Sequence, residues 1–294
     1  MSDPPSGPAT VPGRVPWQLR LFSKTLKKKQ KLRLLLDQIG DVTGKRCLLV
    51  TNGDNNGALN HHFRAHGGDW TWVENEEEHI AEMTALLGER VFPGRASRIP
   101  VEDAGFDVVV TIDVHEHLDD CSAFNRELFR VTRPGGIAVV TTPSGDPWKP
   151  VTVLKNLVGM TKERYGHKVI GYNVRQHRAM LRQAQLEPVA AGSYSKFFTE
   201  MLELMINFAY VKVLSRKGQA RVKAGTIAPS SGEQLRAVEK QYRAYALAYP
   251  LLWMVSKLDL LLFFFRGYAV SVVAVRPGLP DRDSSSSSEG AGLR

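Results

Sequence analysis

Cysteine is nearly absent from this chain, and its scarcity excludes several kinds of architecture. The 294 residues contain two cysteines, Cys47 and Cys121, which cannot build the disulfide framework of a small secreted domain. We expect both to be small core residues in a reducing compartment. Five histidines (His61, His62, His66, His79 and His177) show no metal-ligand spacing with cysteine or carboxylate residues, and the sequence predicts no metal site.

Two further absences concern the first part of the chain. The opening residues MSDPPSGPATVPG lack the apolar core of a signal peptide, so we expect a cytoplasmic protein. Acidic residues are missing from Arg14 to Arg33, which holds eight basic ones. Apolar residues such as Trp17 and Phe22 interleave with them, a pattern typical of one basic amphipathic helix. Its basic face could be solvated, lie on an anionic membrane surface, or bind nucleic acid.

What is present is an ordinary globular composition with regularly alternating elements. Of the residues, 43% are hydrophobic and 23% are charged, which favours one domain with an insertion. Strands alternating with helices predict a parallel sheet with right-handed crossovers. Apolar runs predict strands at 47–50, 70–73, 90–92, 106–112 and 137–142, and helical patterns follow at 57–64, 76–87 and 123–131.

The stretch from Lys45 to Leu59 organises the rest of the chain. A buried strand enters a polar loop, and a helix restarts at Gly57. Such a junction directs backbone N–H groups and the positive end of a helix dipole toward a carboxylate, phosphate or ribose. Glu74 ends the second strand about twenty residues after this loop, where a carboxylate can accept hydrogen bonds from both ribose hydroxyls. The structural alternatives are a plain strand-to-helix turn and a charge cluster at a helix start.

Two longer stretches resemble a known family. They read RIPVEDAGFDVVVTIDVHEHLDD at 98–120 and ELFRVTRPGGIAVVTTP at 127–143. They are similar to the core of class I S-adenosylmethionine-dependent methyltransferases, in the small-molecule group (type 11) that includes ubiquinone-biosynthesis enzymes. The resemblance implies an α/β fold, a doubly wound, seven-stranded Rossmann-like sheet of order 3-2-1-4-5-7-6 with the last strand antiparallel.

The same resemblance implies S-adenosyl-L-methionine as cofactor and assigns site residues. Methyl transfer is an in-line displacement that depends on positioning, with a base added for an oxygen acceptor. His117 is the best candidate base, with helix-start packing as its structural alternative; His167 is the second, and His115, Asp113 and Tyr172 are weaker. The cofactor-binding residues implied are Thr51, Asn52, Gly53, Asp54, Asn56, Glu74, Ala96 and Asp113.

Two departures from the family pattern keep other functions open. Leu49 stands where the family has an acidic residue in the first strand, and Arg95 where a loop aspartate receives the adenine amino group. A methyltransferase-fold binding or scaffold protein without turnover is therefore one alternative. A nucleic-acid methyltransferase is the second, suggested by the basic N-terminus. It is disfavoured because Asp113-Val114-His115-Glu116 replaces the Asn/Asp-Pro-Pro-aromatic motif of amino-group base methylation.

An insertion of about seventy residues separates the last two predicted strands, Pro188–Tyr194 and Tyr268–Val275. It holds two apolar helical patterns, 197–214 and 242–265. Residues 246–265 are long enough to span a membrane. Lys257 and Asp259 lie near the middle of that stretch, so a substrate-covering or interfacial helix is favoured.

Apolar surface on this scale predicts a small lipophilic acceptor, methylated on oxygen or carbon, and peripheral attachment to the anionic inner membrane surface. Packing of the two helices against each other is the structural alternative. The expected segments are a disordered N-terminus (1–16), a basic amphipathic helical segment (17–44), the methyltransferase core (45–195), the helical insertion (196–266), the last core strand (267–278) and a disordered tail (279–294).

Overall fold

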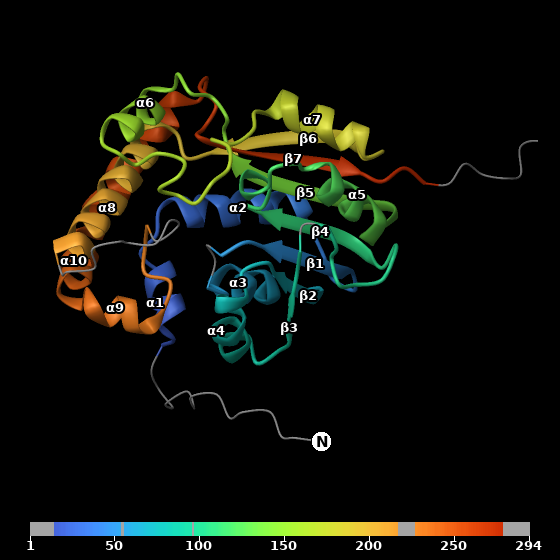
Figure 1. Cartoon of the computed structure of the whole chain (residues 1–294), viewed down its shortest axis with the longest axis horizontal. Coiled ribbons are helices and arrows are strands. Elements are labelled where there is room, and N and C mark those ends of the chain that lie inside the picture. Colours follow the sequence, from blue (N-terminus) through green and yellow to red (C-terminus); the bar gives the residue numbers. More distant parts are fainter. Residues whose placement is uncertain (1–14, 54–55, 96, 217–226, 279–294) are drawn as a thin grey trace, which may run out of the picture.

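A seven-stranded sheet forms the centre of the computed structural model, which describes residues 15–53, 56–95, 97–216 and 227–278 (Figure 1). Its order is β3-β2-β1-β4-β5-β7-β6, and β7 runs antiparallel to both neighbours. The sheet order and the antiparallel last strand predicted from the sequence are therefore confirmed. The strands are β1 (Arg46–Thr51), β2 (Asp69–Glu74), β3 (Val91–Pro93), β4 (Phe106–Ile112), β5 (Thr132–Pro143), β6 (Glu187–Tyr194) and β7 (Ala269–Val275).

Helices cover both faces of this sheet because its central strands are apolar on both sides. In β1, Leu48 faces one layer and Leu49 the other, and both are fully buried. The Leu49 layer packs against α2, α3 and α4, while the Leu48 layer packs against α5 and α7. The helices are α1 (Trp17–Phe22), α2 (Lys27–Ile39), α3 (Ala58–Ala65), α4 (Glu77–Leu87), α5 (Ser122–Val131), α6 (Pro150–Leu157), α7 (Val174–Gln183), α8 (Phe197–Arg216), α9 (Gly232–Ala237) and α10 (Glu239–Ser256), with 3-10 turns η1 (His115–His117) and η2 (Lys257–Leu262).

The basic N-terminal segment is two helices rather than the single helix expected. The hydroxyls of Ser23 and Thr25 donate to the carbonyls of Arg20 and Phe22 at 2.7 and 2.9 Å. Such local hydrogen bonds compete with those of a continuing helix, so α1 ends at Phe22 and α2 begins at Lys27. The idea of a wholly solvated basic face is also wrong, because Lys31 is only 3% exposed.

The helical insertion lies between β6 and β7, beside α1 and α6 (Figure 1). Both expected apolar helices are present, but the second one stops at Ser256 and continues as η2 instead of reaching Phe265. Asp259 explains η2, since its carboxylate accepts from the backbone N–H groups of Lys196 (3.0 Å) and Phe198 (2.8 Å) at the start of α8. Three basic residues between α8 and α9, Lys217, Arg221 and Lys223, lie outside the described residues, as do 1–14 and 279–294.

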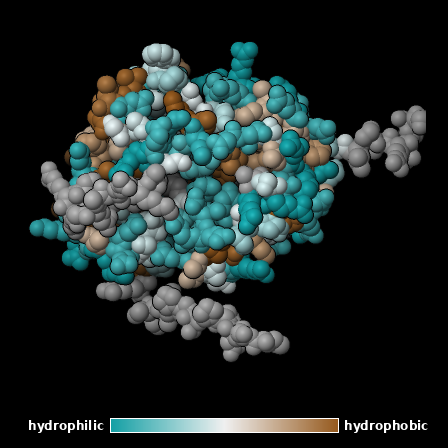
Figure 2. All heavy atoms as spheres, in the orientation of Figure 1, coloured by the Kyte–Doolittle hydropathy of each residue, from teal (hydrophilic) through white to brown (hydrophobic). Residues whose placement is uncertain are grey.

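One described stretch, Glu239–Leu262, is long and apolar enough to cross a membrane, and 17% of its most apolar part is buried. Because the Asp259 carboxylate in this stretch accepts hydrogen bonds from the start of α8, the stretch is attached to the folded domain. Figure 2 shows apolar surface at the upper left, where Figure 1 places α6 and the end of the insertion. The exposed large apolar side chains of the insertion's second half are Leu247, Leu251, Trp253, Met254, Leu258, Leu260, Leu261, Phe263, Phe264 and Phe265.

Candidate active site

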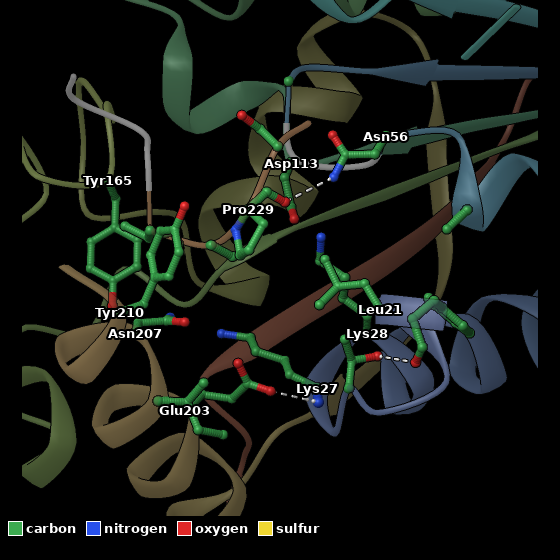
Figure 3. Close-up of a pocket in the computed structure, with 18 of the residues that line it drawn as sticks. Leu21, Lys27, Lys28, Asn56, Asp113, Tyr165, Glu203, Asn207, Tyr210 and Pro229 are labelled. Atoms are coloured by element: carbon green, nitrogen blue, oxygen red, sulfur yellow. Dashed lines mark hydrogen bonds between the residues drawn. The ribbon is translucent and has the colours of Figure 1, made fainter. Parts of the chain in front are cut away.

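A cavity of about 770 Å³ lies where β1 and β4 end and the insertion folds over them. Its volume is within the range of pockets that enclose small-molecule ligands. Asn56 and Asp113 border one side in Figure 3, with Tyr165 and Tyr210 opposite and Lys27 nearby. The cavity therefore joins the polar loop after β1, the end of β4, and the insertion.

The loop after β1 has the geometry expected of a strand-to-helix turn that approaches a ligand. Thr51 is buried at the end of β1, and Asn52, Gly53 and Asn56 line the cavity. Gly53 and Asn56 have positive φ values of 71° and 53°, a backbone conformation that glycine and asparagine tolerate best. Two predicted cofactor residues, Asp54 and Ala96, lie outside the described residues.

Glu74 ends β2 as predicted, but its carboxylate is already engaged by the loop. One oxygen accepts from the N–H groups of Gly53 and Glu76, each at 2.8 Å, and the other from the Thr51 hydroxyl at 2.7 Å. Burial raises the pKa of Glu74, although these hydrogen bonds oppose the shift. Glu74 is fully buried, whereas Glu76 lines the cavity. Glu76 is thus the carboxylate of this region that borders the cavity, and the sequence interpretation did not name it as a site residue.

Asp113 follows β4 and lies in the cavity wall with a φ of 52°. Its carboxylate forms an ion pair with Lys31 of α2. The N-terminal helix therefore contributes a buried cation beside the cofactor loop. Lys27 and Lys31 are one helical turn apart and face the same way, which is the signal in the sequence that could have indicated an inward basic stripe.

His117 and His167 come together although they are far apart in the chain. Their ring centroids are 4.9 Å apart, and both side chains line the cavity. The Nδ1 atom of His117 lies 3.1 Å from the Gly166 carbonyl oxygen. Glu116, which is fully buried, belongs to the same group, and ligand atoms of Glu116, His117 and His167 all lie within 4.8 Å of one another. The sequence predicted no metal site because this grouping depends on the fold.

The weaker base candidates, His115 and Tyr172, make contacts inside the protein and do not line the cavity. His115 is fully buried, its Nε2 lies 2.8 Å from Asn125 Oδ1, and burial lowers its pKa to about 4. The Tyr172 hydroxyl lies 3.5 Å from Cys121 Sγ, and burial raises the pKa of this phenol. Both residues lie outside the cavity wall.

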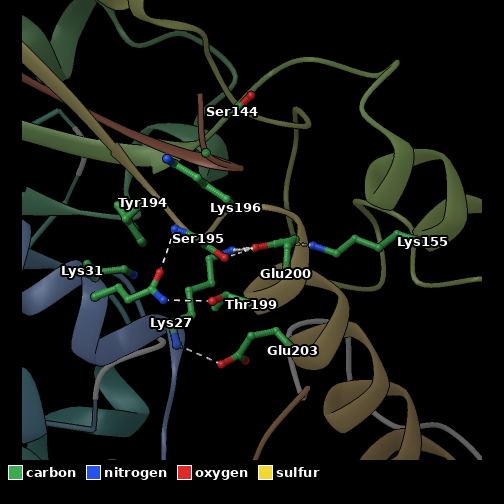
Figure 4. A network of polar contacts seen from close by, with 12 residues as sticks. Lys27, Lys31, Ser144, Lys155, Tyr194, Ser195, Lys196, Thr199, Glu200 and Glu203 are labelled. Atoms are coloured by element: carbon green, nitrogen blue, oxygen red, sulfur yellow. Dashed lines mark hydrogen bonds and ion pairs between the residues drawn. The ribbon is translucent and has the colours of Figure 1, made fainter. Parts of the chain in front are cut away.

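A polar network centred on Glu200 joins α8 to the rest of the site (Figure 4). Glu200 is 1% exposed and forms ion pairs with Lys27 (2.9 Å) and with Lys155 of α6. Burial alone would raise its pKa, but Lys155 and Lys27 together hold that pKa well below its ordinary value. Glu203 lies nearby and accepts from the Lys27 N–H at 3.1 Å, and burial raises its pKa. Two glutamates in the apolar run FFTEMLELMINF were the sequence signal for this network.

Comparison with known proteins agrees with this geometry. Residues 52–140 match the family described as Methyltransferase domain. A protein from Mycolicibacterium smegmatis, described as an S-adenosylmethionine-dependent methyltransferase, is 46% identical over 57 residues, which are 19% of this chain and 22% of that protein. This part of the chain, residues 52–140, therefore matches a methyltransferase family. The family predicted from the sequence is confirmed, and the predicted cofactor is the one this family uses.

The matched part of the methyltransferase domain is short relative to its curated relatives. A ubiquinone biosynthesis O-methyltransferase from Caulobacter sp. is 37% identical over 71 residues, 24% of this chain and 27% of that enzyme. The first-listed relatives are matched over 22% to 32% of their own length. A Bacillus halodurans structure described as a methyltransferase has a TM-score of 0.51 at 18% identity, covering 83% of this chain and 98% of that one, which shows the shared fold.

The two departures from the family pattern occupy different places in the methyltransferase domain. Leu49 is fully buried in the middle of β1, paired in register with Trp72 and Val110. Its apolar side chain therefore belongs to the core. Arg95 is exposed, and its backbone pairs with that of Arg98.

Proposed function

We propose that this protein is an S-adenosylmethionine-dependent methyltransferase acting on a small lipophilic acceptor. The observation that carries the proposal is one continuous cavity that reaches from the loop at Asn52 and Gly53 to the apolar face of α8. A cofactor and an acceptor bound in one cavity can meet in the in-line arrangement that methyl transfer needs.

The cofactor end of the cavity is polar. Asn52, Gly53 and Asn56 line this end, and α3 begins just after Asn56. The dipole at a helix N-terminus favours the carboxylate of an amino-acid moiety. Glu76 and Glu74 would hold the ribose, the latter after an adjustment of the loop that now engages it. When bound, S-adenosylmethionine supplies an electrophilic methyl group, and the chain's task is to orient it.

The acceptor end is mostly apolar. Leu202, Met205 and Ile206 of α8 and Leu252 of α10 line it, a lining that fits a lipophilic body. His117 and His167 border the same cavity. An acceptor hydroxyl directed toward these imidazoles, or a nucleophilic carbon in its place, would be held beside the methyl group.

We also propose that the protein takes its acceptor at an anionic membrane surface. Ten large apolar side chains of the insertion's second half are between 40% and 85% exposed. A soluble monomer rarely shows an apolar surface of this extent without a binding role. Lys257 and Arg266 lie at the same end of the insertion and add positive charge that suits an anionic leaflet.

Calorimetric titration with S-adenosylmethionine, followed by transfer of a labelled methyl group into a lipid extract, tests the enzyme proposal. We expect micromolar binding and label in an apolar product. Absent or millimolar binding would reject it.

A binding or scaffold protein without turnover is the second candidate, and the engaged carboxylate of Glu74 favours it. Tight cofactor binding without labelled product from extracts of a deletion strain would support this candidate. Nucleic-acid methylation has less support, because Lys27 and Lys31 of the basic segment pair with carboxylates inside the protein.

A further inference from the structure

We propose that Glu116, His117 and His167 together bind a divalent transition-metal ion in the wall of the cavity. Each residue offers one ligand atom, and the three atoms lie within 4.8 Å of one another. Ligand bonds to such ions are about 2.0–2.2 Å long, so ligand atoms of one ion lie roughly 3–4 Å apart. Small side-chain rotations are enough to close the site.

The backbone around the three residues holds them in place. The Glu116 carbonyl accepts from the N–H groups of Lys168 (2.8 Å) and Val169 (3.3 Å), which fastens η1 to the segment that carries His167. Two segments that are distant in the sequence are therefore fixed side by side. The ligand set does not depend on one flexible loop.

The hydrogen bond of His117 selects its ligand atom. With Nδ1–H donating to the Gly166 carbonyl at 3.1 Å, the Nε2 lone pair remains available to a metal. Imidazoles that bind metals commonly donate their other N–H to a carbonyl or carboxylate in this way. The His167 ring packs edge-to-face at 4.9 Å from the His117 ring, and one His167 nitrogen lies within 4.8 Å of the other two ligand atoms.

Two imidazoles and one carboxylate define the class of ion. Zn²⁺, Co²⁺, Fe²⁺ and Mn²⁺ suit this donor set, whereas Mg²⁺ and Ca²⁺ prefer oxygen ligands throughout. All three residues line the cavity, so the remaining coordination positions face the space assigned to the acceptor.

The site gives the two histidines a shared role in place of separate roles as bases. A hydroxyl bound to a divalent ion would give its proton to water more readily. Its oxygen would then form the bond to the methyl group while the sulfur–methyl bond of the sulfonium breaks and a neutral thioether leaves, which favours methylation on oxygen. This step rests on the proposed methyl transfer, whereas metal binding itself does not.

Titration of the chelator-stripped full chain with Co²⁺, followed by visible absorption and by Zn²⁺ competition, tests the proposal. We expect one saturable site that is weakened at least about tenfold in each of His117→Ala, His167→Ala and Glu116→Gln. His66→Ala is the matched control, since His66 is exposed and contacts the Gly40 carbonyl away from the cavity. It should bind Co²⁺ as the parent does.

Parallel titration of every variant with S-adenosylmethionine separates this proposal from the preceding one. Cofactor binding without a Co²⁺ site, or a Co²⁺ site that survives in a His117→Ala/His167→Ala double variant, would overturn the metal site alone. A Co²⁺ site in a protein that does not bind the cofactor would overturn the proposed function and leave the metal site standing.

Discussion

Among single residues, Glu74 has the environment with the clearest consequence for cofactor binding. Its fully buried carboxylate accepts from the Thr51 hydroxyl and the Gly53 N–H of the loop after β1 and from the Glu76 N–H just before α4. A carboxylate so placed can fix the loop, bind ribose, or do both. Glu76 lines the cavity two positions later.

We expect Glu74→Ala to weaken S-adenosylmethionine binding by roughly 1–3 kcal/mol, the cost of losing charged hydrogen bonds. Glu76→Ala is the comparison, and calorimetry with thermal unfolding measures both. Unchanged affinity in folded Glu74→Ala, together with a loss in Glu76→Ala, would assign the ribose to Glu76 instead.

At the scale of secondary-structure elements, ionic contacts attach the insertion to the core. Glu200 of α8 binds Lys27 of α2 and Lys155 of α6, so three helices meet at one buried carboxylate. Asp259 of η2 binds the first backbone N–H groups of α8. These contacts hold the cover over the cavity.

Glu200→Gln should destabilise the protein by on the order of 3 kcal/mol at neutral pH, because two lysines lose their shared buried partner. The folded-state pKa of Glu200 lies below its ordinary value of 4.5. Its stabilisation is therefore fully present above about pH 4.5 and is lost as the pH falls through the folded pKa. Urea unfolding at neutral pH and at about pH 3.5 should show the difference between parent and variant shrinking in acid.

Glu203→Gln serves as the control for that experiment. Burial raises the pKa of Glu203, so its charged form contributes no stability at neutral pH. We expect a change within about 1 kcal/mol. Equal losses in both variants would mean that volume or polarity, rather than the Glu200 ion pairs, stabilises α8.

Asp259→Ala should cost about 1–2 kcal/mol, as the loss of a helix N-terminal cap does. Hydrogen exchange should then speed up at the start of α8. Asp37→Ala is a suitable control, since Asp37 is exposed and lies 4.0 Å from Arg33. Protection of α8 that is identical in the two variants would contradict the capping role.

At the scale of the whole molecule, the insertion exposes large apolar side chains, whereas two lysines of the basic N-terminal segment are paired with carboxylates inside the protein. Lys27 and Lys31 point inward, so attachment to membranes through the whole Arg14 to Arg33 stretch loses much of its support. The exposed side chains of Phe263, Phe264 and Phe265 are the better candidates for membrane contact.

Vesicle flotation tests this surface. The parent should float with anionic vesicles and more weakly with neutral ones, since each nearby cation adds about 1 kcal/mol. Replacing Phe263, Phe264 and Phe265 by serine should reduce binding at least about tenfold, while Val189→Ser, at an exposed site on β6, should not. A parent protein that stays at the bottom with both vesicle types would end the membrane proposal, and a stable dimer in its place would assign the surface to self-association.

Local residue patterns were sufficient to predict the sheet and most of its helices. Some signals act over only a few neighbouring residues and can therefore be read from the sequence. Examples are the β-branched run at 106–112, the glycines around the loop after β1, and Asn173 at the start of α7. In the structure, the Asn173 side chain caps α7 by accepting a hydrogen bond from the Gln176 N–H at 3.0 Å. The resemblance at 98–143 added the strand order, which local patterns could not supply.

Only the tertiary structure decided which distant side chains share one space. The meeting of His167 with Glu116 and His117, the pairing of Lys31 with Asp113, and the burial of Glu200 between two lysines all join segments far apart in the chain. The sequence determined which residues must be buried and where the chain turns, because these follow from local hydrophobicity and backbone preference. Whether a basic or imidazole side chain faces solvent or a buried partner depends on long-range packing, and therefore became visible only in the folded chain.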